Sequence, residues 1–574
     1  MSNAEYIGKV RIDKSYYSVT GSGNTEIESM LDAVKSNSDY STLIIEKKEW
    51  PYLYHLASGR ENLLNWYPFD ESSRVLEIGA ECGALTSLFV RYASSVTSIE
   101  PSEELSLINA ERNKDADNLE IKIGDVKAIL DSLTESYDVI TLISGNTFYP
   151  IDEYLPMLRK LLAPSGKIIV AVDNRLGFKA LAEFADEPDD CNDAHMYSKK
   201  ELESIFKKYG FDNSSFYYPY PDHILPSVIY SDSLLPHKGE LTDNDRNLDN
   251  RNFKLFEESA VYDDLIEAGV FPVFSNSYLV ILGDNQVERV IYAKISDNRH
   301  SRYRIITNIV ETANGLVVRK TCLKPEGRTH IENVKKNEDK LSNIFNGRAE
   351  ACKSSLKNDT IEFEYIEGIR FSSKLDSVCD SGDVDKITEV LDEYYDLIKC
   401  MKTSETFEPD NDFVNVFGEV NLPETLPSGN CVDIDLIPDN VVIRNGRYVI
   451  LDYEWVFDIS IPLEYVFWKG LFSSVAFSRL CSDKKEAVYS HYGLDAEKRA
   501  LYLRMEESFQ RYVSGGELTL RDFVKEMGRN TETVRQIIDD LNAVKVSNDN
   551  LKYELDLIKN SKSWNMLKKM GIVK

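Results

Sequence analysis

Five short apolar segments that alternate with helix-forming stretches constrain the fold of this chain most. They are VLEIG at 75–79, SVTSIE at 95–100, LEIKIG at 119–124, YDVITLI at 137–143 and GKIIVAV at 166–172. Because helices between successive strands favour parallel pairing, the pattern predicts a doubly wound α/β sheet. Ligands of such sheets bind beyond the carboxyl ends of the strands, and a site is expected there.

A glycine-containing loop with the sequence EIGAECGA begins at residue 77, at the end of the first segment. Gly79 and Gly83 allow a tight turn and a close approach of the backbone to a ligand. Glu100 ends the second segment, 23 residues after Glu77, where a carboxylate can accept hydrogen bonds from both hydroxyls of a ribose. Asp125 follows the third segment.

This series resembles the Glu/Asp-x-Gly-x-Gly-x-Gly loop of class I S-adenosylmethionine-dependent methyltransferases. Glu81 stands in place of the middle glycine, which narrows the loop or repels the methionine carboxylate of the donor. An NAD-binding loop would have its third glycine at Ala84 and would leave only Gly79 matched. Another nucleotide-binding sheet, or a sheet that has lost its ligand, is the alternative. The resemblance implies that the donor is bound by Glu77, Gly79, Gly83, Glu100 and Asp125, with Asp125 near the adenine amine.

Two flanking segments are candidates for contacts with the acceptor. One precedes the sheet at 54–69, and the other leaves its fifth strand at 172–181. Arg60, Asn174 and Arg175 are expected to hold a sugar or a phosphate, since a guanidinium pairs well with anionic oxygens. Core packing by a lid helix is the alternative. The segment 219–241 is rich in proline and aromatic residues, and it is expected to be a long loop over the substrate or a simple connection.

The second half contains the segment VDIDLIPDNVVIRNGRYVILDYEW at 432–455. Asp435 lies five residues before Asn440, and Asp452 ends a strand that follows a hairpin turn. Phosphoryl transfer needs a carboxylate that accepts the proton of the acceptor, and an amide and a second carboxylate that hold Mg²⁺. Asp435, Asn440 and Asp452 match these roles in that order. A surface hairpin with incidental acids is the alternative.

The same segment resembles the catalytic loop of the protein-kinase-like superfamily. That loop runs His-x-Asp, four residues and Asn, with a Mg²⁺-binding Asp on the next hairpin. Asp433 replaces the His, and the run from Asp452 to Trp455 is more similar to the aminoglycoside-phosphotransferase branch. The resemblance implies that ATP and Mg²⁺ bind to the second half.

Residues 286–325 are predicted to form strands, the last of which offers Lys320 to the nucleotide phosphates. The stretch 329–345 has helical periodicity, and Glu338 lies on its apolar stripe. A buried acid needs a partner, so Glu338 rather than Glu332 is predicted to pair with Lys320. A lysine on a solvated strand edge is the alternative. FEYIEG at 363–368 is expected to be a hinge between two lobes. No glycine-rich phosphate loop is found at 293–305, which leaves a pseudokinase open.

A heptad seam in the last fifty residues predicts a coiled coil. Asn548 in its core favours one register, most often a parallel dimer, whereas packing on the preceding domain is the alternative. The tail after it has lysines, apolar anchors and no acid, which favours a membrane surface or a membrane-bound glycosyltransferase as partner, or a frayed terminus. The seam consists of Val534, Ile537, Leu541, Val544, Asn548, Leu551, Leu555 and Ile558.

Composition excludes several classes of function. The net charge of −29 over 574 residues argues against broad nucleic-acid binding, which depends on Lys and Arg. Eight cysteines without any CxxC pair suggest neither a zinc site nor a disulfide framework. No apolar run approaches the roughly 18 residues that cross a bilayer, and no signal peptide is recognised. A cytoplasmic protein, peripheral on the inner face of the plasma membrane, is expected.

Taken in order, these parts resemble the bifunctional methyltransferase/kinase family that terminates O-antigen polysaccharide chains in bacteria. The predicted fold class is α/β, with a Rossmann-like class I methyltransferase domain, a bilobal α+β kinase-like domain and a coiled-coil helix. The predicted boundaries are an N-terminal extension and lid at 1–70, the methyltransferase domain at 71–284, the kinase-like domain at 285–528 with lobes at 285–367 and 368–528, the coiled coil at 529–560 and the basic tail at 561–574.

The resemblance implies that the terminal sugar of a polysaccharide or lipid-linked oligosaccharide is phosphorylated and that the phosphate or a sugar oxygen is methylated. It also implies a homo-oligomer joined by the coiled coil. One alternative is a methyltransferase whose kinase-like half is a glycan-recognising pseudokinase. The other is a non-catalytic scaffold that recruits a glycosyltransferase.

Overall fold

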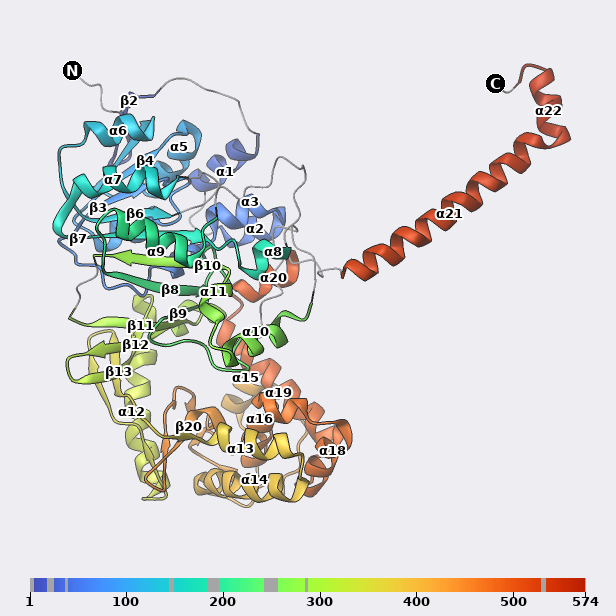
Figure 1. Cartoon of the computed structure of the whole chain (residues 1–574). Coiled ribbons are helices and arrows are strands. Elements are labelled where there is room, and N and C mark those ends of the chain that lie inside the picture. The colour runs from blue at the N-terminus through green and yellow to red at the C-terminus, as the bar shows by residue number, and fades with distance from the viewer. Residues whose placement is uncertain are drawn as a thin grey trace.

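The computed structural model describes residues 5–17, 25–36, 40–143, 149–182, 196–241, 256–283, 287–527 and 533–572. The expected boundaries at 284/285 and 528/529, and Lys574 of the tail, lie outside these residues. Figure 1 shows two stacked halves and a long C-terminal helix that projects away from both.

The first half is built on a parallel sheet, and the five predicted strands are confirmed. They are β3 (Arg74–Ile78), β4 (Ser95–Glu100), β5 (Leu119–Gly124), β6 (Tyr137–Ile143) and β7 (Leu162–Asp173). The strands lie in the order β5-β4-β3-β6-β7, and all four neighbouring pairs are parallel. Strand order therefore reverses between β3 and β6, and a ligand crevice is expected at that point.

Helices cover both faces of this sheet. Residues of the central strand alternate between two buried apolar clusters, with Leu76 and Ile78 in one and Val75 in the other, as a parallel sheet requires. The helices and short strands of this half are β1 (Glu5–Ile7), β2 (Val10–Tyr16), α1 (Thr25–Ser36), α4 (Thr86–Tyr92), α5 (Glu103–Arg112), α6 (Val126–Ser132), α7 (Ile151–Leu161), α8 (Phe178–Ala182), α9 (Lys199–Lys208), α10 (Glu258–Glu267) and α11 (Phe271–Phe274).

The segment 219–241, expected to be a long loop over the substrate or a simple connection, is in fact partly strand. β8 (Ser214–Tyr220) and β9 (Val228–Ser231) pair in antiparallel register, and β8 also pairs with β10 (Ser277–Leu282), which lies beside β7. The other side of β9 pairs with β11 (Arg289–Ile295). An unpaired strand edge is thereby avoided, and one sheet continues from the first half into the second.

The second half begins with the remainder of that sheet. The order β11-β12-β13-β16-β15 is antiparallel throughout, and α12 (Arg328–Phe345) packs on it. The strands are β12 (Ile305–Thr312), β13 (Gly315–Cys322), β15 (Ser354–Lys357) and β16 (Thr360–Glu364). The predicted strands of 286–325 and the helix of 329–345 are therefore present.

A mostly helical part follows and surrounds the hairpin of β20 (Val441–Arg444) and β21 (Arg447–Ile450). One apolar cluster joins α12, this hairpin and the helices. The other elements are β14 (Ala349–Ala351), β17 (Ile369–Arg370), α13 (Phe371–Ser381), α14 (Val384–Ile398), α15 (Asn411–Phe417), β18 (Ser428–Gly429), β19 (Val432–Asp433), β22 (Val456–Phe457), β23 (Ile461–Pro462), α16 (Leu463–Ser473), α17 (Val475–Arg479), α18 (Ser482–His491) and α19 (Ala496–Ser514).

The last helix of the second half packs against two N-terminal helices of the first half. Helices α2 (Ser41–Lys47) and α3 (Trp50–Leu56) precede the sheet, and α20 (Leu520–Met527) packs against them. Ile44, Leu53 and Phe523 share one buried cluster, and the Lys48 ammonium lies 2.7 Å from the Glu526 carboxylate. The expected lid is thus held from outside by the C-terminal end of the second half.

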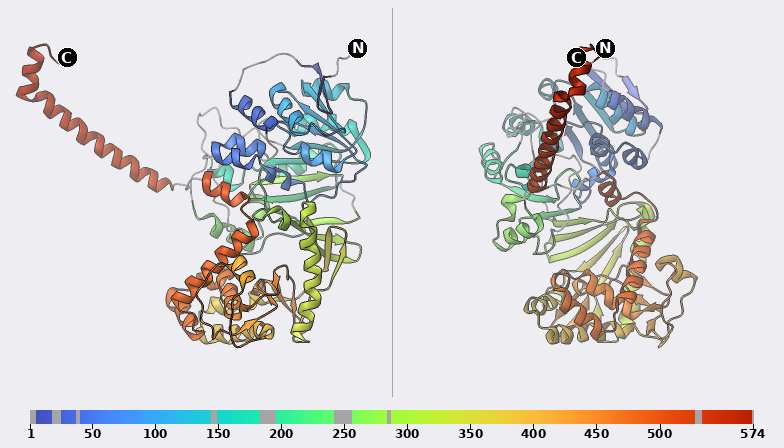
Figure 2. Two further views of the ribbon diagram at one scale, coloured as in Figure 1. Left: turned by 180° about the vertical axis from the view of Figure 1, so that it is seen from behind. Right: turned by 90° about the vertical axis from the view of Figure 1, so that its right-hand side faces the viewer.

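The C-terminal helices are α21 (Val534–Asn560) and α22 (Lys562–Lys569). The left view of Figure 2 shows α21 projecting from the body, and Leu541 and Leu551 of its seam are 54% and 62% exposed. A partner for this face stays a prediction. Among the described residues, no helix has both the length and the apolar character needed to cross a membrane.

Candidate functional site

A small cleft lies beyond the carboxyl ends of β3 and β6, where the strand order reverses. The loop after β3 forms one side, β6 the second and the lid the third. The residues that line it are Tyr54, Arg60, Glu77, Ile78, Gly79, Ala80, Glu81, Ala84, Leu85, Thr141 and Ile143. Of the predicted donor-binding residues, Glu77 and Gly79 are in this lining.

The loop after β3 needs its two glycines. Gly79 and Gly83 have φ of 73° and 76°. A Cβ atom at Gly79 would lie 2.6 Å from Cε2 of Tyr149, and one at Gly83 would lie 2.2 Å from Oδ1 of Asn109. Glu81 between them also has a positive φ, 47°, which costs a residue with a Cβ atom about 1–2 kcal/mol. The backbone thus keeps a glycine-like conformation where the sequence has a glutamate.

Glu77 and Glu100 are buried at the base of the loop. Oε2 of Glu77 accepts hydrogen bonds from the hydroxyls of Thr86 and Ser98, both at 2.6 Å. The two carboxylate oxygens of Glu100 accept from the backbone N–H groups of Glu81 and Ser102, both at 2.9 Å. Burial raises the pKa of each carboxyl to about 7, although these hydrogen bonds oppose the shift. Glu100 therefore changes charge near neutral pH.

The lid adds Arg60 to the lining of the cleft and places His55 behind it, with Nδ1 3.8 Å from Oε2 of Glu81. Burial, with the positive charges of Arg60 and Arg112, lowers the pKa of His55 to about 4, so its ring is neutral at pH 7 and a weak base. Arg60 is 5% exposed. Its Nη1 donates to the Ile224 carbonyl at 3.2 Å, and its guanidinium lies 4.4 Å from the ring centroid of Tyr54. Its buried Nε has no hydrogen-bond partner among the described residues.

Three other predicted residues have different surroundings. Asn174 is completely buried, and its amide donates to the carbonyls of Val273 and Ser275, so it holds a loop and is not at a rim. This prediction is corrected. Arg175 donates to the Met196 carbonyl at 2.7 Å and remains partly exposed. Asp125 caps α6 by accepting from the Ala128 N–H at 2.8 Å.

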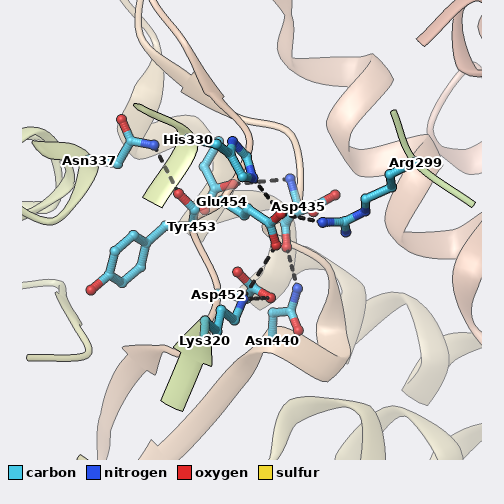
Figure 3. A network of polar contacts seen from close by, with 10 residues as sticks. Arg299, Lys320, His330, Asn337, Asp435, Asn440, Asp452, Tyr453 and Glu454 are labelled. Atoms are coloured by element: carbon cyan, nitrogen blue, oxygen red, sulfur yellow. Dashed lines mark hydrogen bonds and ion pairs between the residues drawn. The ribbon is translucent and has the colours of Figure 1, made fainter. Parts of the chain in front are cut away.

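The second candidate site lies between the sheet and the hairpin of the second half, and Figure 3 shows its polar network. Nζ of Lys320, on β13, lies 2.6 Å from Oδ2 of Asp452 and 3.4 Å from Oε2 of Glu454. Oε1 of Glu454 contacts Nε2 of His330 at 2.7 Å and is also paired with Arg299. Burial would raise the pKa of Glu454, but Arg299, Lys320 and His330 hold it well below its usual range.

Asp435 and Asn440 lie on the loop before the hairpin. Nδ2 of Asn440 donates to the backbone carbonyl of Asp435 at 2.9 Å, which leaves its amide oxygen as the atom suited to a cation. Oδ1 of Asp435 lies 3.3 Å from Nζ of Lys469. Burial raises the pKa of Asp435, and Lys469 opposes that shift. The sequence therefore brings Lys320, Asp435, Asn440 and Asp452 into one site.

The predicted pairing of Lys320 with Glu338 is wrong. Glu338 is buried on the stripe of α12, but Oε2 accepts from Lys335 at 2.7 Å and from the hydroxyl of Ser354 at 2.6 Å. Glu454 binds Lys320 instead. Helical periodicity placed Glu338 on the inner face of α12, but it could not show that the hydroxyl of Ser354, at the start of β15, would bind the carboxylate.

The side chains of Asn440 and Asp452 can hold a Mg²⁺ ion only together with a phosphate ligand. In the described part of the chain, Oδ1 of Asp452 is buried without a hydrogen-bond partner, as a cation ligand would be. However, the described residues contain no group of three or more His, Cys, Asp or Glu side chains that could hold a metal ion. Mg²⁺ at kinase-type sites is typically held by one or two protein groups together with phosphate oxygens, and Asn440 with Asp452 meets that requirement.

Comparison with known proteins concerns the first half. Residues 52–215 match the family model described as "Methyltransferase domain", and every residue that lines the cleft falls in this range. The chain therefore contains a methyltransferase domain with a Rossmann-like α/β fold. No curated protein gives a match.

Three of the matching solved structures illustrate the extent of similarity. Phosphoethanolamine N-methyltransferase 1 of Haemonchus contortus, in complex with phosphoethanolamine and S-adenosylhomocysteine, is 13% identical over 45% of this chain and 48% of its own, with a TM-score of 0.26. An S-adenosylmethionine-dependent methyltransferase of Mesorhizobium loti is 13% identical over 40% and 99%, with a TM-score of 0.25. Precorrin 8W decarboxylase of Methanobacterium thermoautotrophicum is 13% identical over 40% and 90%, with a TM-score of 0.22.

Proposed function

We propose that the first half transfers a methyl group from S-adenosylmethionine to an acceptor oxygen. The observation that carries this proposal is the cleft at the strand-order reversal, within the residues that match a methyltransferase domain. Gly79 and Gly83 give the backbone the turn that brings it close to the donor, and ionised Glu100 would accept from its ribose hydroxyls. S-adenosylmethionine supplies an electrophilic methyl carbon, and positioning contributes much of the rate.

The acceptor that best suits this cleft is an anion. Arg60 places a buried guanidinium in the lining, and its Nε has no hydrogen-bond partner within the described ranges. A guanidinium binds phosphate oxygens well. A sugar hydroxyl would also need a general base, but His55, with a pKa of about 4, is poorly suited to that role. A phosphate oxygen is already anionic and needs none.

We further propose that the second half transfers the γ-phosphoryl group of ATP to a sugar hydroxyl, which would supply such an anionic acceptor. Lys320 would bind phosphate oxygens, Asn440 and Asp452 would hold Mg²⁺, and Asp435 would accept the hydroxyl proton. The support is that four residues predicted from spacing converge from two separate elements. The bond between Lys320 and Asp452 also suits a pseudokinase that only recognises glycan, so activity must be measured.

The substrate we propose is the terminus of a bacterial surface polysaccharide or of a lipid-linked oligosaccharide. The methyltransferase domain, the second site and the heptad helix follow one another in the chain. This order favours the family that terminates O-antigen polysaccharide chains. We propose that α21 joins copies of the chain, and that α22 with its lysines contacts the membrane surface or a glycosyltransferase.

The test uses purified full-length protein with labelled S-adenosylmethionine, Mg-ATP and a defined oligosaccharide. The bifunctional proposal expects label in the product only when ATP is present. Because methylation of a sugar phosphate gives a phosphodiester, the label should resist a phosphomonoesterase and be released by a phosphodiesterase. Methylation that proceeds equally without ATP would favour the methyltransferase with a pseudokinase. Absence of binding by either nucleotide ligand in calorimetry would favour a scaffold.

A further inference from the structure

The connection between β11 and β12, residues 296–304, has no glycine and carries Arg299, Arg302 and Arg304. In protein kinases a glycine-rich loop covers the phosphates of ATP. Here a side chain from the connection enters the second site instead. Figure 3 shows the Arg299 guanidinium directed at Glu454 and Asp435, and its Nη1 is the nitrogen that pairs with Oε1 of Glu454.

The backbone of this connection is held in place on both sides of Arg299. Nε of Arg304 donates to the Arg299 carbonyl at 2.7 Å, and the His300 N–H donates to the Val513 carbonyl at 2.9 Å. The Asp297 carboxylate is bonded to the amide of Asn62 in the lid. Arg299 is therefore presented by a fixed turn, and little freedom is lost when it binds a ligand.

The guanidinium retains donors for a ligand. Its side chain is 23% exposed, whereas that of Glu454 is 2% exposed. Within the described part of the chain, Nη1 is the one guanidinium nitrogen of Arg299 with a hydrogen-bond acceptor. A guanidinium has five N–H groups in a planar fork, so one edge can stay on Glu454 while the other contacts an oxyanion.

The location of Arg299 matches that of the group being transferred. Glu454 lies two residues after Asp452, the proposed Mg²⁺ ligand, and the positive charge of Arg299 also acts on the carboxyl of Asp435, the proposed proton acceptor. A transferred phosphoryl group must lie between these two carboxylates. Its negative charge is spread over three oxygens in the transition state, and a planar fork of donors suits that distribution.

We propose that Arg299 is an arginine finger supplied by the chain itself, which contacts the oxygens of the transferred phosphoryl group and is kept in position by Glu454. This inference rests on the proposed phosphotransferase function. In the step, the acceptor oxygen forms a bond to the γ-phosphorus as the bond to the β-phosphate oxygen breaks. ADP leaves, and the acceptor proton passes to Asp435. Arg299 stabilises the negative charge on the oxygens of the phosphoryl group while one bond forms and the other breaks.

The test does not require the acceptor. Calorimetry measures the affinity of the full-length protein for Mg-ADP with and without aluminium fluoride, which mimics the transferred group. The unsubstituted protein is expected to bind Mg-ADP about 100-fold more tightly or better with the fluoride. Arg299→Lys and Arg299→Met should lose most of this gain and bind Mg-ADP alone as before. Arg302→Met is the matched control, because that guanidinium lies over the Tyr303 ring, and it should keep the gain.

Three results would overturn the inference and leave the proposed function standing. They are a gain that the Arg299 variants retain, the absence of any gain in the unsubstituted protein, and an equal loss of Mg-ADP binding in both Arg299 variants at an unchanged thermal unfolding midpoint. The last would make Arg299 a residue that only positions Glu454 and Lys320. If the unsubstituted protein binds no nucleotide with Mg²⁺, the phosphotransferase function fails together with the inference. Arg299→Lys keeps a positive charge opposite the buried Glu454 carboxylate. It is therefore the variant expected to fold if Arg299→Met does not.

Discussion

Glycine at position 81 should improve the methyl-donor site. Glu81 is 8% exposed and has a φ of 47°. The left-handed conformation costs a residue with a Cβ atom about 1–2 kcal/mol, and about 0.5–1 kcal/mol of that is offset by the greater freedom of glycine in the unfolded chain. Glu81→Gly is therefore expected to raise the free energy of unfolding by roughly 0.5–1 kcal/mol from conformation alone.

The charge of Glu81 should act on donor affinity. Burial is the main cause of the raised pKa of Glu77 and of Glu100, and the charge of Glu81 adds to it. Ionised Glu100 is the form that accepts hydrogen bonds from a ribose. Two carboxylates about 6 Å apart repel by roughly 3 kcal/mol at an effective dielectric constant of about 20, and solvent reduces this at a cleft mouth. A gain on the order of 1 kcal/mol for the methionine carboxylate means about five- to tenfold tighter binding of S-adenosylmethionine.

Calorimetry at pH 8 with Glu81→Gly and Glu81→Gln separates the two effects. Both variants lose the charge, so both should bind S-adenosylmethionine more tightly. Both variants should gain some stability in urea denaturation at pH 8 by losing the repulsion between Glu81 and the buried carboxylates. The glycine variant should gain more, because glutamine keeps the strained φ. Asn358→Gly, at another position of φ 53°, is the matched control for a change of backbone strain outside the cleft. Weaker donor binding by both variants would refute the reasoning and would show that the Glu81 carboxylate itself binds the donor.

Further outcomes are expected at the two sites and at the C-terminal helix. Because burial raises the folded pKa of Glu77 and Glu100 from 4.5 to about 7, the folded chain keeps protons that the unfolded chain releases. The free energy of unfolding should therefore fall as pH rises from about 4.5 to 7 in urea titrations. Donor affinity should rise with pH around 7, and Glu100→Gln should flatten this dependence in calorimetry. Glu454→Gln should weaken Mg-ATP binding about tenfold or more by removing a carboxylate that positions the nucleotide-binding lysine, whereas Glu338→Gln should leave it unchanged. Leu551→Asp should reduce the oligomer seen in analytical ultracentrifugation, and an unchanged mass would exclude α21 as the interface.

Most of the correct predictions from the sequence came from patterns within one element or between adjacent elements. The five strands from 74 to 173 follow from apolar runs that are each read within one element. The glycine loop followed from the spacing of Gly79 and Gly83, and both have the positive φ that makes glycine necessary. Asp435, Asn440 and Asp452 were also recognisable, because a loop and a hairpin that adjoin in sequence place them together.

Contacts between distant segments could not be predicted in this way. Glu454 was visible in the run after Asp452, but nothing local shows that it binds Lys320, 134 positions earlier. The apparent partner, Glu338, satisfied the helical pattern and is held by Ser354 instead. Asn174 was also misinterpreted. As a polar residue at a strand end it was predicted to bind a ligand, but its amide donates to a backbone carbonyl within the fold.

The two halves are joined closely enough that neither site is a property of one half alone. The lid that carries Arg60 packs against Phe523 at the far end of the second half, so the donor cleft depends on residues well beyond 215, where the methyltransferase match ends. The β11–β12 connection joins both sites more directly. Asp297 is bonded to Asn62 of the lid, and Arg299, two residues later, is paired with Glu454 of the second site. Any ligand that moves this connection at one site must strain a contact at the other.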